Sequence, residues 1–354
     1  MKKCVKVGNV NIGGDAPISI QSMLNTRTAD IVESVRQLEE LQDAGCEIAR
    51  LAVPDMEAAF ALKYIREKAK IPIVADIHFD YRLALQAMES GVDKIRINPG
   101  NIGDEENVKK VVMMAKARRI PIRVGVNSGS LEKDIFQQYG RVTAEGLAES
   151  ALRNVAILEK YDFDDIVVSL KSSDVQMNFD AYRIVNERCD YPLHIGVTEA
   201  GTPGRGKIKS AAGIGALLLE GIGDTMRVSL TANPVEEVLF GRELLQALGI
   251  RKSHIEIVSC PTCGRTQVDL EAIATQVENR TAELEKQGVS GIKIAVMGCA
   301  VNGPGEAKGA DIGVACGNGE GLLFRNGETV KKVPEDRIVD ELMALAIEIH
   351  GRQK

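Results

Sequence analysis

Between residues 18 and 248 the chain repeats one pattern: a short run of β-branched residues, a polar turn, and a longer stretch with the spacing of an amphipathic helix. Eight such units in roughly 230 residues are typical of a closed (β/α)₈ barrel of the TIM type. The alternative is an open doubly wound sheet, which usually has fewer strands and a glycine-rich first turn. Because Ser22-Met23-Leu24 provides no such turn, the pattern favours the barrel. The expected strands are Ile18–Met23, Glu47–Val53, Pro72–Ile77, Lys94–Asn98, Pro121–Val126, Ile166–Leu170, Leu193–Val197 and Thr225–Leu230, and the helices between them include Ile31–Ala44, Met56–Ala69, Glu105–Ala117 and Ala144–Glu159.

After Gly249 strands and helices no longer alternate regularly, which indicates a small α+β domain and not further barrel units. We therefore expect a barrel over residues 1–250 and a second domain over residues 251–354, joined by a polar linker near Gly249–Ser253. The elements expected in the second domain are the strands Ile255–Ser259 and Ile292–Met297, the helices Asp269–Gln287 and Glu335–His350, and a hairpin through Asn326-Gly327.

Charge and hydropathy exclude several classes of protein. The net charge of −6 opposes the phosphate attraction on which nucleic-acid binding depends, so no polynucleotide partner is expected. The longest uncharged apolar stretch, Ala211–Leu219, has nine residues, whereas a membrane-spanning helix needs about 20. The first residues carry two lysines but no apolar segment behind them, so they do not form a signal peptide. A cytoplasmic location is the expectation.

Cationic side chains gather where the predicted strands end, which is the face that carries the active site in this fold. Several like charges around one mouth repel each other unless an anion binds between them, and arginine matches phosphate oxygens well. The alternative is a network in which each arginine pairs with a nearby carboxylate. The residues at these strand ends are Arg50, Asp76, His78, Arg96, Asn98, Arg123, Asn127, Lys171, Glu199, Arg227 and Ser229.

Three features of this face have two interpretations each. Lys171 is either one of the anion-binding cations or a Schiff-base nucleophile, although a nucleophilic lysine favours a less charged setting. His78 is either a general acid or a hydrogen-bonded structural histidine. The glycine-rich turn Gly201–Lys207 lacks the Ser or Thr that a P-loop requires at its end, so it is either a phosphate-binding turn or a flexible connection.

The seven cysteines are an odd number, and four of them lie in the last hundred residues. Cys4, Cys46 and Cys189 are scattered and are expected to be small buried hydrophobic residues. Cys260-Pro-Thr-Cys263 and Cys299 each follow a predicted strand, and glycines around Cys299 allow the backbone to fold closely around a bulky group. Three thiolates and a nearby carboxylate are unusual for structural zinc and suit an iron–sulfur cluster with one exchangeable iron. Cys316 is the alternative fourth ligand.

Three segments resemble one family over long runs: Cys260-Pro-Thr-Cys-Gly-Arg265, Gly298-Cys-Ala-Val-Asn-Gly-Pro-Gly-Glu-Ala307 and Gly221-Ile-Gly-Asp-Thr-Met-Arg-Val-Ser229. They resemble the (E)-4-hydroxy-3-methylbut-2-enyl diphosphate synthases of the methylerythritol phosphate route to isoprenoids, in the bacterial two-domain form. The resemblance implies a [4Fe-4S] cluster on Cys260, Cys263 and Cys299 with Glu306 on the fourth iron. It also implies that Glu199 lies beside the reacting carbons and that the diphosphate is bound by Arg50, Arg96, Arg123, Asn127, Lys171 and Ser229.

The implied reaction is the reductive ring opening and dehydroxylation of 2-C-methyl-D-erythritol 2,4-cyclodiphosphate to (E)-4-hydroxy-3-methylbut-2-enyl diphosphate. Flavodoxin or ferredoxin would donate the electrons, and the resemblance implies a homodimer whose barrel mouth is closed by the partner's cluster domain. Two other classes stay open at this point. One is a zinc-stabilised barrel lyase or aldolase that uses Lys171, and the other is a non-enzymatic iron–sulfur sensor or electron carrier.

Overall fold

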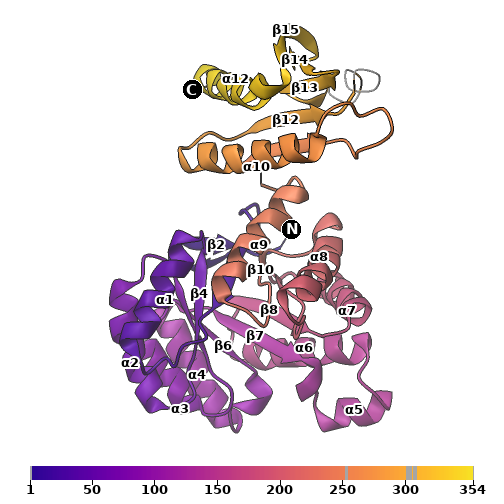
Figure 1. Ribbon diagram of the computed structural model, residues 1–354. Helices are drawn as coiled ribbons and strands as arrows, with labels where there is room; N and C mark the ends of the chain where they lie inside the picture. Colours follow the sequence, from indigo (N-terminus) through magenta and orange to yellow (C-terminus); the bar gives the residue numbers. More distant parts are fainter. Residues whose placement is uncertain (1, 252–253, 300–304, 306–308, 354) are drawn as a thin grey trace. The chain divides into compact units, whose positions relative to one another are not determined.

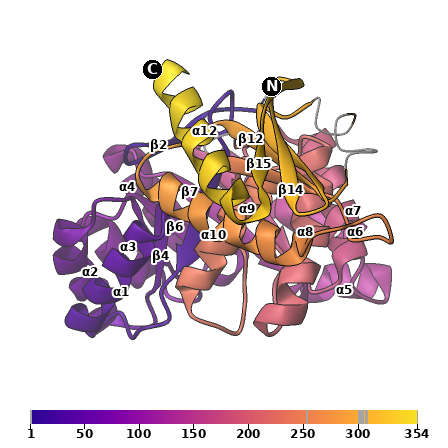
Figure 2. The ribbon, with the colours of Figure 1, turned by 45° about the horizontal axis from the view of Figure 1, so that its top comes forward.

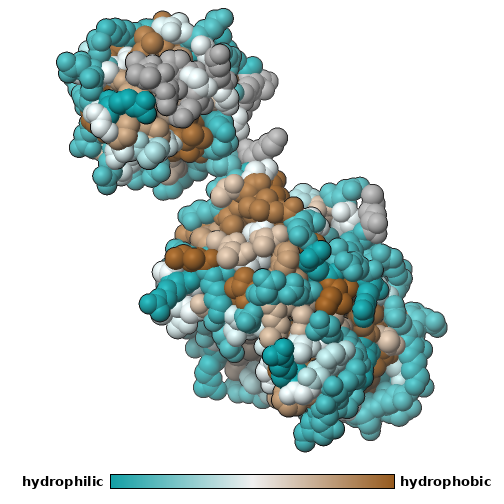
Figure 3. All heavy atoms as spheres, turned by 90° about the vertical axis from the view of Figure 1, so that its right-hand side faces the viewer, coloured by the Kyte–Doolittle hydropathy of each residue, from teal (hydrophilic) through white to brown (hydrophobic). Residues whose placement is uncertain are grey.

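The computed structural model describes residues 2–251, 254–299, 305 and 309–353. It divides into two compact units, Met1–Leu244 and Leu245–Lys354. The boundary expected near residue 250 stays a prediction, and Lys252 and Ser253 of the expected linker lie outside the described residues. In the described part of the chain no helix is long and apolar enough to cross a membrane. Hydrophilic residues predominate on the face of the first unit that Figure 3 shows.

The first unit is the predicted barrel of parallel strands surrounded by helices (Figure 1). Its strands run in the order β8-β7-β6-β5-β4-β3-β10-β9, and a parallel bridge between Val168 and Leu193 links β8 to β9 and closes the ring. The strands are β3 (Ser19–Met23), β4 (Ile48–Ala52), β5 (Ile73–Asp76), β6 (Lys94–Ile97), β7 (Ile122–Asn127), β8 (Ile166–Lys171), β9 (His194–Ile195) and β10 (Thr225–Met226). The helices are α1 (Ile31–Asp43), α2 (Met56–Lys68), α3 (Tyr81–Glu89), α4 (Glu105–Arg118), α6 (Ala144–Glu159), α7 (Val175–Arg188), α8 (Pro203–Leu219) and α9 (Pro234–Ala247).

Most strand-to-helix loops of the barrel end in a residue that caps the next helix. Asp30, Asp55, Asp104 and Asp174 each accept a hydrogen bond from the backbone N–H three residues later, at the start of α1, α2, α4 and α7. Such a cap satisfies one of the unpaired N–H groups of the first turn and contributes about 1 kcal/mol. The caps therefore fix where each loop stops, on the same face that carries the candidate site.

A hairpin closes the opposite end of the barrel. Its strands are β1 (Val5–Val7) and β2 (Val10–Ile12), which the sequence pattern did not predict. Val5, Val7 and Ile12 are buried against Ile48, Val74 and Val167, which lie in the first two residues of β4, β5 and β8. The end of the barrel at the amino ends of the strands is thus an apolar core. A further helix that the pattern missed, α5 (Lys133–Tyr139), follows β7.

Two barrel strands are shorter than expected. The pattern predicts strands over 193–197 and 225–230, whereas β9 and β10 each have two residues. Arg227 still donates its N–H to the carbonyl of Ile195 at 3.0 Å, after which the two chains leave the ladder. Arg227 and Ser229 consequently lie in a loop and do not close a strand, and Glu199 has the left-handed backbone conformation, with φ of 51°.

The second unit is a five-stranded mixed sheet with the order β11-β12-β13-β14-β15. Its strands are β11 (Ile255–Ser259), β12 (Ile292–Met297), β13 (Ile312–Gly317), β14 (Glu320–Arg325) and β15 (Glu328–Pro334). Helices α10 (Leu270–Lys286) and α12 (Ile338–Gln353) lie next to each other (Figure 2) and share a buried apolar cluster with β12 and β13. Strand β13 was not among the strands expected in this domain. Gly313 permits this strand because a Cβ there would lie 2.2 Å from the Phe324 ring.

Candidate active site

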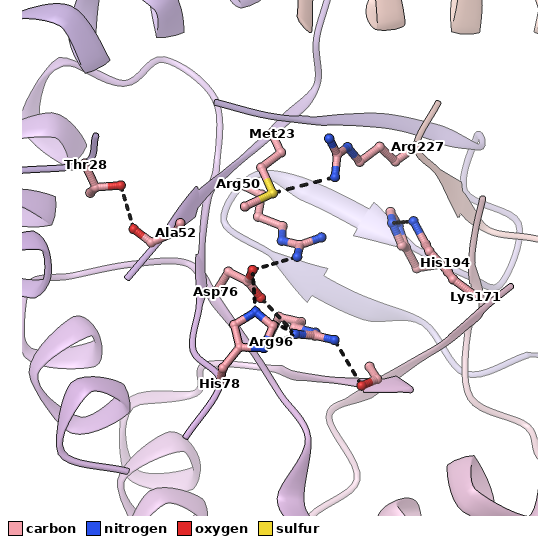
Figure 4. Close-up of polar contacts among 11 residues, drawn as sticks. Met23, Thr28, Arg50, Ala52, Asp76, His78, Arg96, Lys171, His194 and Arg227 are labelled. Atoms are coloured by element: carbon pink, nitrogen blue, oxygen red, sulfur yellow. Dashed lines mark hydrogen bonds and ion pairs between the residues drawn. The ribbon is translucent and has the colours of Figure 1, made fainter. Parts of the chain in front are cut away.

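One side of the barrel mouth is organised around a buried carboxylate (Figure 4). Asp76, the last residue of β5, contacts Arg50 of β4 at 2.7 Å and Arg96 of β6 at 3.3 Å. His78 contacts the same carboxylate at 3.2 Å. Burial alone would raise the pKa of Asp76, but Arg50, His78 and Arg96 hold it well below its usual range. Asp76 is therefore a fixed anion that orients two arginines.

Gly125 of β7 makes room for one of these arginines. Arg96 donates from Nη2 to the Gly125 carbonyl at 3.1 Å. A Cβ on Gly125 would lie 2.3 Å from Arg96 Nε, closer than real Cβ atoms come to any heavy atom. The glycine thus permits the guanidinium to lie flat against β7, where the carbonyl and Asp76 both hold it.

The other side of the mouth has a second carboxylate. Glu237, which is buried on α9, contacts Arg227 at 3.4 Å and accepts hydrogen bonds from Ser22 Oγ at 3.0 Å and from the Leu230 N–H at 2.9 Å. These bonds tie α9 to β3 and to the loop after β10. Arg227 also points toward Met23 Sδ, at 3.6 Å (Figure 4).

Lys171, the last residue of β8, is 7% exposed and faces His194 of β9, which is fully buried (Figure 4). The distance from Lys171 Nζ to His194 Nε2 is 3.4 Å. Gly196 leaves the space for this lysine, since a Cβ there would lie 2.8 Å from Nζ. Burial and then the positive charges of Arg123, Arg227 and Arg50 lower the pKa of Lys171 well below its usual value.

The mouth holds more cations than carboxylates. Asp76 and Glu237 face Arg50, Arg96, Arg123 and Arg227 together with two lysines, Lys94 and Lys171. Arg123 is 1% exposed, and its Nε and Nη1 atoms have no hydrogen-bond partner in the described part of the chain. Buried donors without partners are costly unless a ligand satisfies them. The site therefore combines a partial ion network with donors that an anion can satisfy.

The remaining residues expected at the mouth occupy different surroundings. Asn127 ends β7 and is half-buried, as is Ser229 in the loop after β10. Asn98 is buried and accepts a hydrogen bond from the Gly100 N–H at 3.1 Å, so it caps a local turn. Glu199 is exposed after β9. Its left-handed backbone is uncommon for a non-glycine residue.

A pocket of about 370 Å³ opens beside the first carboxylate. His78 and Asp76 line it on the polar side, and Met23, Val53, Leu83 and Phe79 are among the apolar residues that line the rest. Phe79 is 77% exposed. An apolar group attached to an anion on Arg50 or Arg96 would find a matching surface here.

Sequence reasoning missed three residues of this site: Lys94, His194 and Glu237. A signal existed for Lys94, because residues two apart on a strand share a face and Lys94 precedes Arg96 by two positions. No such signal existed for His194, because Gly196, two positions later, has no side chain. Glu237 lies on a helix after the last strand, and no local pattern indicates that it reaches the mouth.

In the second unit, two of the candidate metal ligands follow neighbouring parallel strands. Cys260 comes after β11 and Cys299 after β12, so both lie at the same edge of the sheet. The Gly298 N–H donates to Cys260 Sγ at 3.2 Å. Cys263 is exposed, and hydrogen bonds from the backbone and side chain of Arg265 lower the pKa of its thiol.

These cysteines fit an iron–sulfur cluster by their chemistry, because a cluster requires thiolates and is tuned by N–H donors to sulfur. No three His, Cys, Asp or Glu side chains that could hold a single metal ion occur among the residues that the structure describes. Glu306, the expected fourth ligand, lies outside the described residues.

Two other thiols are buried. Cys316 lies within β13 in the apolar core, and burial, with the charges of Glu335 and Cys260, raises the pKa of its thiol to about 12. Burial raises the pKa of Cys46 to about 12 as well, as expected for a small core residue. The same expectation is wrong for Cys4, which is exposed at the edge of the terminal hairpin, and Cys189 is half-buried.

Comparison with known proteins now identifies the family. The profile of the GcpE TIM-barrel domain matches residues 2–242, and that of the GcpE protein C-terminal domain matches residues 256–348. The chain belongs to the GcpE family. A relative from Clostridium perfringens, named 4-hydroxy-3-methylbut-2-en-1-yl diphosphate synthase (flavodoxin), is 60% identical over 341 residues, which are 96% of this chain and 97% of the relative. A relative of the same name from Fusobacterium nucleatum is 54% identical and covers 98% of this GcpE chain and 97% of its own length.

Among solved structures, 3-dehydroquinate dehydratase from Geobacillus kaustophilus aligns with a TM-score of 0.51 at 18% identity. The alignment covers 70% of this GcpE chain and 98% of that enzyme. At this level of identity the likeness shows the barrel fold alone.

Proposed function

We propose that this GcpE protein catalyses the reductive ring opening and dehydroxylation of 2-C-methyl-D-erythritol 2,4-cyclodiphosphate to (E)-4-hydroxy-3-methylbut-2-enyl diphosphate. The observation that carries the proposal is the excess of buried cations at the carboxyl ends of the barrel strands, in a chain 60% identical to a synthase of that name. The barrel, expected over residues 1–250, binds the substrate, and the domain over residues 251–354 carries the redox group.

The diphosphate binds on the arginines of the mouth. Arg123 has two donor atoms without a partner in the described chain, and Arg50 and Arg96 are held in place by Asp76. Lys171, Asn127 and Ser229 complete the set of donors. When the C–O bond of the ring breaks, negative charge develops on the phosphate oxygen, and fixed cations around it stabilise that charge.

The hydrocarbon part of the substrate lies toward the pocket beside His78. Its apolar lining by Met23, Val53 and Leu83 accommodates the methyl-bearing carbon chain, while Asp76 and His78 lie at its polar edge. Glu199 follows β9 and acts beside the reacting carbons as the catalytic carboxylate.

Cys260, Cys263 and Cys299, with Glu306, would hold the iron–sulfur cluster. When bound, the cluster would supply one-electron transfer from an external donor to this site. Flavodoxin is the proposed donor, because the relatives carry it in their names. Glu306 would offer the cluster a carboxylate, which is a harder ligand than thiolate and less suited to a soft site.

The cluster and the substrate face are contributed by different subunits of a homodimer. Mixing a Glu199→Gln chain with a Cys263→Ser chain tests this arrangement, because one of the two sites in each mixed dimer then has both residues intact. Each parental dimer is inactive, so recovered activity measures sharing across subunits. No recovery in verified mixed dimers contradicts it.

Anaerobic purification with iron, sulfide and zinc analysis, a visible spectrum and a turnover assay tests the proposed function. We expect about four irons and four sulfides per chain and a lower kcat/KM in Arg123→Ala with an unchanged spectrum. Zinc without iron would point to the lyase in which Lys171 is the nucleophile. Iron without binding of the cyclic diphosphate would point to a sensor or electron carrier.

A further inference from the structure

Three basic side chains lie close to the arginines of the mouth. Lys94 of β6 and His194 of β9 are 0% exposed, and Lys171 of β8 is 7% exposed. We refer to Lys94, Lys171 and His194 as the basic floor. Unlike the arginines, these three groups can lose their protons within the range of pH in which proteins are folded. They are therefore the groups whose charge can respond to a ligand.

The hydrogen bonds of the basic floor are incomplete. Within the described residues, Lys94 Nζ and His194 Nδ1 have no hydrogen-bond partner, and neither Lys94 nor Lys171 forms an ion pair with a carboxylate. The 3.4 Å contact between Lys171 Nζ and His194 Nε2 is a hydrogen bond only if one nitrogen offers a lone pair. When this hydrogen bond is formed, one of the two nitrogens is unprotonated and can accept a proton.

The charges that face the floor are almost all positive. Four arginines carry fixed charges, and the two carboxylates of the mouth offset two of them. Lys94 faces Arg123 and Arg50. His194 faces the same two arginines and the lysines Lys171 and Lys94. Lys171 faces Arg123, Arg227 and Arg50, and its one acidic neighbour is Glu237. Burial first, and then these charges, lower the pKa of all three groups well below their usual values. Without an anion, an added proton on the floor is unfavourable.

We propose that Lys94 and His194, with Lys171, form a proton-accepting floor of the diphosphate site, so that binding of the cyclic diphosphate is accompanied by net proton uptake into the barrel. A dianion on Arg50, Arg96 and Arg123 removes the repulsion that keeps the floor unprotonated, and Lys171 can contact a phosphate oxygen as an ammonium. The inference rests on the proposed function, since it requires that diphosphate binds at this mouth.

The direction of the pH dependence of diphosphate affinity follows from the linkage between proton binding and ligand binding. The complex binds more protons than the free enzyme, so affinity rises as pH falls between the pKa of the floor in the complex and its lower pKa in the free enzyme. One proton taken up per site gives a change of about tenfold in Kd per pH unit in that range. Ring opening leaves one more ionised oxygen on the phosphate, and the same floor can match this charge with a further proton.

Calorimetric titration of the holoenzyme with 2-C-methyl-D-erythritol 2,4-cyclodiphosphate, without reductant, measures the uptake directly. Each phosphorus of this ligand has one strongly acidic oxygen, so the ligand itself carries no titrating proton near neutral pH. The observed heat is measured at pH 8 in buffers of different ionisation enthalpy, and the slope gives the protons taken up. We expect an uptake approaching about one proton per site. Binding with zero slope overturns the inference alone, whereas absence of binding overturns the proposed function and the inference with it.

Variants assign the proton to the floor. His194→Gln and Lys94→Met keep side chains of similar size without a titrating group, and we expect each to reduce both the slope and the pH dependence of Kd. A purely structural role would change Kd equally at every pH. Lys110→Met, at an exposed lysine over the Tyr81 ring, is the matched control and should retain the full uptake. Full uptake kept in both His194→Gln and Lys94→Met would overturn the assignment.

Discussion

Replacing Gly125 by alanine should move Arg96 without removing any charge from the mouth. The added methyl group would lie 2.3 Å from Arg96 Nε and 2.8 Å from its Nη2, and the guanidinium is held there by Asp76 and by the Gly125 carbonyl. Gly125 is paired with Ser169 of β8, and the preceding Val124 with Ile97 of β6, so the arginine side chain moves more easily than the strand. Overpacking of this kind costs about 1–3 kcal/mol of folding stability.

The effect on binding comes from losing the aligned guanidinium. Truncating one partner of a desolvated charge pair costs about 2–5 kcal/mol. Because Arg96 is displaced and not removed, we take the low end, about 2 kcal/mol, which corresponds to a roughly thirtyfold rise in Kd for the cyclic diphosphate. Calorimetry gives Kd, and chemical denaturation gives the free energy of unfolding.

Gly351→Ala is the matched control for Gly125→Ala. Gly351 lies exposed in α12, and a Cβ there would meet nothing within 4 Å. This change should leave Kd unaltered and slightly raise stability, since alanine favours a helix over glycine by about 1 kcal/mol. Equal Kd values in the two variants would refute the placement of Arg96 in the diphosphate site.

Four further predictions follow from single residues. Lys171→Ala should lower kcat/KM at least roughly tenfold while the visible spectrum of the holoenzyme stays unchanged, and unchanged kinetics would favour a purely structural lysine. Glu306→Ala should give a fragile cluster and little turnover by iron analysis and activity, whereas Cys316→Ala, at a buried strand position, should be nearly silent; the reverse outcome reassigns the fourth ligand. Asp76→Asn should lower the free energy of unfolding by about 3–5 kcal/mol at pH 7. Because the pKa of Asp76 is depressed on folding, the stability it contributes is present above about pH 4 and is lost at lower pH, so denaturation curves of the two proteins should converge there. Lys94→Met should raise the free energy of unfolding of the substrate-free enzyme by about 1–3 kcal/mol, since it removes a buried donor without a partner in the described chain, and a loss of stability would show that the lysine is satisfied.

The alternation of apolar and polar residues predicted the barrel because each unit has a strong local signal. Strand Ile255–Ser259 and helix Ala144–Glu159 have the expected bounds, and most other elements differ by one or two residues. The short strands β9 and β10 were overestimated because their β-branched runs continue past the point where the ladder ends. The β-propensity of a segment depends on its own residues and does not indicate where the neighbouring strand ends.

The candidate site was predictable only in part. Residues at strand ends, such as Arg50 and Arg96, are found by the rule that the carboxyl ends of barrel strands carry the site. Glu237 could not be found in this way, because its contact with Arg227 depends on how α9 returns to the mouth. The spacing of the cysteines did not decide whether Cys316 is a ligand. The structure distinguishes the two thiols, because Cys316 is buried within β13 whereas Cys263 is exposed.

The two ends of the barrel have different physical tasks. At the amino ends of the strands, the terminal hairpin buries Val5, Val7 and Ile12. The apolar surface that stabilises this end is therefore at the opposite end of the strands from the mouth. Toward the mouth the interior is filled by charged and polar side chains, several of them with unsatisfied donors in the described chain. Unpaired buried donors lower the stability of the free enzyme, and a ligand that accepts their hydrogen bonds offsets this loss. Under the proposed function, a barrel that is apolar at one end and cationic at the other binds an anion more strongly because its empty state is unfavourable. The proton uptake that we propose for Lys94, Lys171 and His194 would limit that cost, since these groups would gain their charge only with the anion.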